Sequence, residues 1–167
     1  IPAHFDINDL SGKAKCKAAL QAKAGFTDSP DTPLIGMVCR LTAQKGFDYI
    51  VPILRDLMAH NLGLVIVGTG DPLVCQQLAD VSRMHPTKFK FIHGFEPELA
   101  HLVEAGSDFF LMPSEFEPCG LNQMYSLAYA TLPIVRNVGG LSDTCISDLT
   151  VIPFFTALAI TLSISLV

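Results

Sequence analysis

The sequence predicts an α/β domain built around a doubly wound, parallel sheet. Short apolar runs alternate along the chain with stretches whose apolar residues recur at helical spacing, and this alternation is typical of repeated strand–helix units. The strand-like runs are almost continuously apolar, which indicates strands buried on both faces of the sheet. With 167 residues the chain has the size of one domain with one core.

Five runs are predicted to be strands because they are apolar and are bounded by turn or polar residues. The first lies between Pro33 and Arg40, and the fourth leads into an acidic segment. The predicted strands are residues 34–39, 64–67, 89–93, 108–112 and 133–136. Since a helical pattern follows each strand, we expect right-handed crossovers and helices on both faces of the sheet.

A helix is expected after each of these strands. Asp71 and Pro72 supply the second helix with an N-cap side chain and a proline at its first position. Gly139 and Gly140 open the last helix. The predicted helices are residues 47–60, 73–84, 97–105, 121–130 and a short segment that begins at 139.

The charge balance argues against a nucleic-acid-binding surface. The formal net charge is −5, and the chain has no run of lysines and arginines that could follow a phosphate backbone. One local basic excess occurs near the amino-terminal end, where the spacing predicts a solvated helix face. It consists of Lys13, Lys15, Lys17 and Lys23.

Cysteine and histidine spacing favours neither a disulfide framework nor a metal site. Five cysteines are scattered without a C-x-x-C pair, which indicates a reducing compartment. His93 and His101 have no metal-ligand partner at useful spacing, so we expect structural roles for both. The segment Gly68-Thr69-Gly70 resembles the opening of a dinucleotide fingerprint, but Leu73 stands at the third glycine position. We therefore expect no metal and no cofactor.

The chain divides at about residue 146. Residues 1–146 carry the α/β pattern, whereas residues 147–167 form an apolar tail of different character. The stretch 151–167 has no charged residue, but it contains Pro153 and is shorter than the ~20 residues of a transmembrane helix, so a membrane anchor is not favoured. The chain opens within a motif at Ile1, so we expect it to be part of a longer protein.

The most informative motif is residues 115–125, where the fourth strand ends and a helix begins. It combines Glu115 and Glu117 with a proline and with Gly120, whose bare backbone can approach a ligand. This run closely resembles the nucleotide-sugar motif of starch and glycogen synthases, which transfer glucose from ADP-glucose or UDP-glucose to a growing α-1,4-glucan. Three further segments agree in order and spacing. They are residues 12–21, 40–46 and 139–144.

The resemblance covers residues 1 to about 146 and implies a Rossmann-like carboxyl-terminal domain of a two-domain GT-B glycosyltransferase. It implies an ADP-glucose or UDP-glucose donor, an α-1,4-glucan acceptor and an amino-terminal domain that this chain lacks. The isolated chain is therefore expected to be inactive. The bacterial cytoplasm or the plastid stroma is the implied compartment.

The resemblance also implies catalytic roles. Arg40 and Lys45, in the loop after the first strand, would stabilise the departing diphosphate. Glu117 would grip the glucosyl group and stabilise an oxocarbenium-like transition state; the alternative for Glu117 is a carboxylate that merely favours a helix N-terminus. A second catalytic carboxylate at Glu115 is rejected, because the family's retaining transfer is generally viewed as a front-face reaction that demands no protein nucleophile.

Further residues are implied to bind the substrate. Cys119 and Gly120 would lie against sugar hydroxyls, and the backbone N–H groups of Leu121 and Asn122 would cradle the distal phosphate. Phe95 would stack on the nucleotide base, with a core aromatic as the alternative. Tyr125 stands where related retaining transferases carry a second Glu that can bind the ribose, and starch and glycogen synthases show the same departure.

Two other functions stay open at this point. One is another retaining two-domain glycosyltransferase with a UDP-sugar donor, against which Tyr125 and residues 40–46 speak. The other is a catalytically silent module that binds nucleotide or glucan, against which the presence of Arg40, Lys45 and Glu117 speaks.

Overall fold

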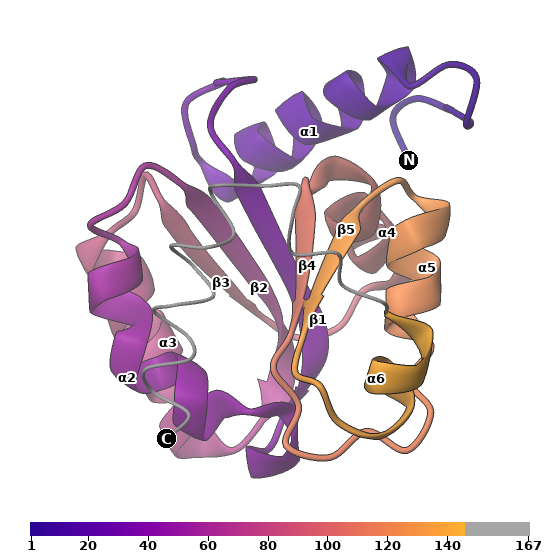
Figure 1. Ribbon diagram of the computed structural model, residues 1–167. Helices are drawn as coiled ribbons and strands as arrows, with labels where there is room; N and C mark the ends of the chain where they lie inside the picture. The colour runs from indigo at the N-terminus through magenta and orange to yellow at the C-terminus, as the bar shows by residue number, and fades with distance from the viewer. Residues whose placement is uncertain (146–167) are drawn as a thin grey trace.

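The computed structural model describes residues 1–145, which form a parallel sheet flanked by helices (Figure 1). The strands are β1 (Leu34–Leu41), β2 (Gly63–Gly70), β3 (Phe89–His93), β4 (Phe109–Met112) and β5 (Leu132–Val135). Their spatial order is β3-β2-β1-β4-β5, and every pairing is parallel. The chain builds outward from β1 to β3 and then returns to place β4 on the other side of β1. This reversal creates a topological switch point between β1 and β4, where open α/β sheets bind ligands.

Helices cover both faces of the sheet, as predicted. They are α1 (Ser11–Ala24), α2 (Phe47–Leu57), α3 (Pro72–Met84), α4 (Pro97–Gly106), α5 (Asn122–Ala128) and α6 (Gly139–Thr144), with a short 3-10 helix η1 (Ala43–Lys45). Figure 1 shows α2 and α3 on one side of the sheet and α4 and α5 on the other. Successive residues of β1 alternate between the two cores. Ile35 and Met37 pack in the cluster that includes α2 and α3, whereas Leu34 and Val38 pack in the cluster that includes α1 and α4.

The predicted strands and helices are all present, and their ends differ by a few residues. The predicted cap of α3 is confirmed, because the Asp71 carboxylate accepts hydrogen bonds from the backbone N–H groups of Leu73 (2.8 Å) and Val74 (3.1 Å). The helix predicted to reach 130 ends at Ala128, and Ala130 adopts a left-handed φ of 51°. The boundary predicted at 146 and the tail of residues 147–167 lie outside the described residues.

The prediction of a solvated lysine face is wrong for Lys13 and Lys17. The Lys13 ammonium donates to the carbonyl oxygens of Ala105 (3.2 Å) and Tyr129 (2.9 Å), and burial lowers its pKa to about 8. Lys17 is buried and pairs with Asp108 at 2.7 Å. The reason is that α1 packs against α4, so that the inner lysines reach groups at the end of α4 and the start of β4. Lys15 and Lys23 are exposed, as predicted.

Candidate nucleotide-sugar site

The two loops at the switch point are joined to each other. The backbone N–H of Glu115 donates to the Gln44 carbonyl oxygen at 2.9 Å, and the Gln44 side-chain amide donates to the Phe116 carbonyl oxygen at 3.0 Å. The next residue of the first loop adds a third contact, because the Lys45 ammonium pairs with the Glu117 carboxylate. The loop after β1 and the acidic loop after β4 therefore form one structural unit, although 72 residues separate Lys45 from Glu117.

Glu117 is held from two sides. Its Oε2 pairs with Lys45, and the same oxygen accepts a hydrogen bond from the Ser114 hydroxyl at 3.3 Å. The side chains of Lys45 and Glu117 are only 21% and 12% exposed, so this pair is shielded from water much more than a surface ion pair. The contacts with Lys45 and Ser114 fix the orientation of the Glu117 carboxylate.

Gly46 allows the two loops to approach closely. Its φ is +80°, and a Cβ at this position would overlap the Pro113 carbonyl oxygen. Gly46→Ala should lower the free energy of unfolding by about 2–3 kcal/mol, through backbone strain and this overlap together. Gly25→Ala is the matched control, because φ there is +79° but no atom lies within 4 Å of the added Cβ. Denaturant titrations that gave equal losses for the two variants would contradict tight packing between the loops.

Residues 139–144 contact the backbone of the acidic loop. The Gly140 N–H donates to the Glu117 carbonyl oxygen at 2.9 Å. A Cβ at Gly139 would overlap that same oxygen, and one at Gly140 would overlap the Cys119 carbonyl oxygen. Arg136 adds a hydrogen bond to the Ser114 carbonyl oxygen at 3.2 Å. The glycine pair therefore allows a backbone-to-backbone contact that holds residues 117–119 in place.

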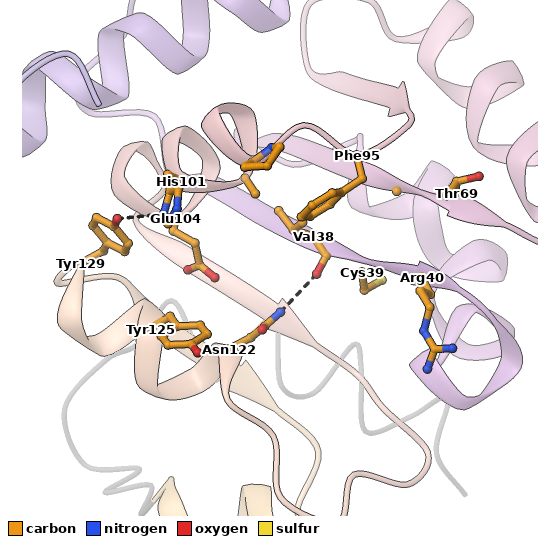
Figure 2. A pocket seen from close by; sticks show the side chains of 13 residues that line it. Val38, Cys39, Arg40, Thr69, Phe95, His101, Glu104, Asn122, Tyr125 and Tyr129 are labelled. Carbon is orange, nitrogen blue, oxygen red and sulfur yellow. Dashed lines mark hydrogen bonds between the residues drawn. The ribbon is translucent and has the colours of Figure 1, made fainter.

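A pocket of about 510 Å³ opens beside these loops. Figure 2 shows Arg40, Phe95, Asn122 and Tyr125 among its lining residues. The structure thus brings together four of the predicted site residues, which come from β1, α5 and the loop after β3. Lys45 lines a smaller pocket that shares Val38, Cys39 and Asn122 with the first one, which we call the main pocket. Glu117 lines neither of these two pockets and is linked to them through Lys45.

Phe95 is 64% exposed, so the alternative of a core aromatic is wrong. Tyr125 is 53% exposed and faces the same pocket. The Asn122 side chain donates to the Val38 carbonyl oxygen at 3.3 Å, which ties the start of α5 to β1. The backbone N–H groups of Leu121 and Asn122 donate to no acceptor among residues 1–145.

The remaining predicted residues, Cys119, Gly120 and Leu121, lie on the loop that leads into α5. Cys119 and Leu121 are exposed, and Gly120 has a left-handed φ of +67°. None of the three lines the main pocket. They lie on the same loop as Glu117 rather than against Phe95 and Tyr125.

Sequence reasoning missed several residues of the pocket wall. His101 and Tyr129 share a hydrogen bond of 2.9 Å, so His101 has a structural partner as expected but also faces the pocket. Cys39 lies in the wall, but burial raises the pKa of its thiol to about 12, which makes it a poor nucleophile. Glu104 is a buried carboxylate in the wall. Its signal in the sequence is an acid among apolar residues at a helix end, where the helix dipole disfavours it.

The described part of the chain offers no metal or membrane feature. Residues 1–145 contain no cluster of three His, Cys, Asp or Glu side chains that could hold a metal ion. Among the same residues, no helix has the length and apolarity needed to cross a membrane.

Comparison with known proteins gives a family and close relatives. The family model described as "Glycosyl transferases group 1" matches residues 21–160. Glycogen synthase of Aliivibrio fischeri strain MJ11 is 56% identical over 147 residues, which are 86% of this chain and 30% of that protein. Glycogen synthase of Vibrio atlanticus strain LGP32 is 59% identical over 133 residues, 80% of this chain and 27% of that protein. The chain therefore spans about a third or less of the length of these relatives.

Two solved structures resemble this chain. The catalytic domain of starch synthase IV from Arabidopsis thaliana, bound to ADP and acarbose, matches with a TM-score of 0.85 and 28% identity, over 99% of this chain and 38% of that one. Anabaena Alr3699/HepE in complex with UDP-glucose matches with a TM-score of 0.62 and 19% identity, which shows likeness of fold. The predicted fold and the predicted resemblance are both confirmed. The chain belongs to the glycosyl transferases group 1 family.

Proposed function

We propose that the chain forms the donor-binding half of a retaining glucosyltransferase that moves glucose from ADP-glucose to the non-reducing end of an α-1,4-glucan. The proposal rests on the junction of the two switch-point loops, where Arg40 lines the main pocket and Lys45, paired with Glu117, lines the adjoining one. The likeness to bacterial glycogen synthases and to a starch synthase bound to ADP supports it.

Each group has a chemical part in this proposal. The leaving diphosphate develops negative charge, and the Arg40 guanidinium and Lys45 ammonium stabilise it. The unpaired amides of Leu121 and Asn122 add donors for the distal phosphate. Glu117 lies near the sugar and stabilises its developing positive charge. Phe95 offers a flat, exposed face for the base.

Transfer requires more than this half. The glycogen synthases are more than three times as long as the matched region, and we infer that an amino-terminal domain completes the cleft and binds the glucan. The 167-residue chain alone should bind nucleotide weakly and transfer little glucose. The bacterial origin of these relatives favours the bacterial cytoplasm over the plastid stroma.

Calorimetric titration of the 167-residue chain tests the donor. ADP and ADP-glucose should bind more tightly than UDP and UDP-glucose, and Arg40→Met should weaken ADP binding by about tenfold or more, because a charge-assisted contact to phosphate is lost. Arg55→Met is the control, since Arg55 is exposed on α2 and lines no part of the pocket. Equal affinity for the two nucleotides would favour the UDP-sugar alternative, and loss of ADP binding in both variants would contradict the site.

A further inference from the structure

Glu104 occupies an unusual place in the pocket wall. It lies in the last turn of α4, is only 7% exposed, and is the one carboxylate among the described residues that line the main pocket. Figure 2 shows its carboxylate on the pocket side of α4, facing the side of the wall that carries Tyr125 and Asn122. The contacts of Glu117, Lys45 and Arg40 do not involve it.

One of the two Glu104 oxygens has no hydrogen-bond partner in the described part of the chain. The single proton of the Ser126 hydroxyl is shared between Oε2 at 2.8 Å and the Asn122 carbonyl oxygen at 2.7 Å. Oε1 accepts no hydrogen bond from any residue among 1–145. The residue as a whole is buried and lines the pocket, so an oxygen of its carboxylate without a protein donor is open to a donor on a ligand in that pocket.

The position of Glu104 is also electrostatically unfavourable. Burial raises the pKa of its carboxyl to about 7, and a negative charge at the carboxyl end of a helix is opposed by the helix dipole. Lys13 lies near enough to attract the carboxylate, but its ammonium is bonded to Ala105, Tyr129 and Thr131 instead. A residue that breaks local rules in a binding pocket is a candidate for function.

We propose that Glu104 accepts a hydrogen bond from a ribose hydroxyl of the bound nucleoside diphosphate. This inference rests on the proposed function and adds a residue that sets affinity for the donor. Like-charge repulsion keeps the diphosphate away from Glu104 and favours its placement at Arg40, which Figure 2 shows well apart from Glu104. A nucleotide that extends from Arg40 along the pocket presents its ribose hydroxyls, which are good donors, to the free oxygen.

Nucleotide analogues test the contact directly. The 167-residue chain is titrated at about pH 8, above the pKa of Glu104, with ADP, 2′-deoxy-ADP and 3′-deoxy-ADP. The unchanged chain should bind one deoxy analogue about tenfold or more weakly than ADP, as expected for a lost hydrogen bond to a charged group. In Glu104→Leu, ADP should bind as weakly as that analogue, and the preference for the hydroxyl should disappear.

Two further variants separate loss of the contact from loss of the fold. Glu104→Gln preserves the shape of the side chain and should reduce the preference even if Glu104→Leu fails to fold. Glu98→Gln, an exposed acid on the same helix, should leave it unchanged. A preference that persists in Glu104→Gln and Glu104→Leu would overturn the inference. The inference would also be overturned if the Glu104 variants, unlike the unchanged chain, bound ADP and inosine diphosphate equally. That result would assign Glu104 a contact with the amino group of the base. ADP binding that depends on Arg40 but not on Glu104 would agree with the proposed function and contradict only the contact between Glu104 and the ribose.

Discussion

Glu117→Gln should lower turnover by roughly 10²-fold or more in a chimera that carries residues 1–145 in place of the matching region of the Aliivibrio fischeri glycogen synthase. Glutamine keeps the shape and the contact with Ser114 but removes the negative charge that, in the proposed function, stabilises the transition state. ADP affinity should stay the same or increase, because Lys45 loses its anionic partner and becomes more available to phosphate. Steady-state kinetics with ADP-glucose and calorimetry with ADP measure the two effects.

Glu115→Gln is the matched control for this experiment. Glu115 is exposed and joins the loop contact only through its backbone N–H, so its replacement should change turnover little. An equal loss of turnover in the two variants would favour a paired-carboxylate mechanism and contradict the proposed one. A parallel loss of ADP affinity in Glu117→Gln would assign Glu117 a structural role instead. A chimera without activity would favour the catalytically silent module.

Asp108→Ala should lower the free energy of unfolding by about 3 kcal/mol. The Asp108 carboxylate accepts hydrogen bonds from the Lys17 ammonium at 2.7 Å and from the Leu34 N–H at 2.8 Å. It therefore links α1 and β1 to the start of β4. Removal leaves a lysine whose side chain is only 11% exposed without its counter-charge, and an orphaned backbone donor at the head of the central strand. Urea denaturation of the 167-residue chain measures the loss.

Asp80→Ala provides the comparison. Asp80 pairs with Arg83 one turn away on α3, but both side chains are largely exposed, and such pairs contribute less than about 1 kcal/mol. Losses of similar size for the two aspartates would show that the Lys17–Asp108 pair is not a structural link.

The strands were predictable because a parallel sheet with helices on both faces demands continuous apolar runs, and 89–93 was predicted with its observed ends. Helix ends were less predictable. The helix predicted over 47–60 ends at Leu57, since the chain turns there toward β2 through backbone bonds that no periodicity encodes. The burial of Lys13 and Lys17 could not be predicted for a related reason. Only the packing of α1 on α4 decides which lysines of α1 reach polar groups of other elements.

The site was predictable in part because its motifs follow strand ends, which a parallel sheet brings to one edge. The meeting of Arg40, Phe95 and Asn122 at one pocket agrees with that reasoning. Contacts between distant segments were not predictable from local pattern. Gln44 bonds the loop that carries Glu117, and Glu104 reaches the pocket from the far end of α4. Neither role can be inferred from the periodicity of apolar residues in the sequence.

A crystal structure of the 167-residue chain with ADP at saturating concentration would show directly where the diphosphate binds. We expect the diphosphate to lie against Arg40 and Lys45 at the junction of the loops after β1 and β4, with the base on Phe95. ADP bound on another face of the sheet, or a diphosphate that contacts neither cation, would contradict it.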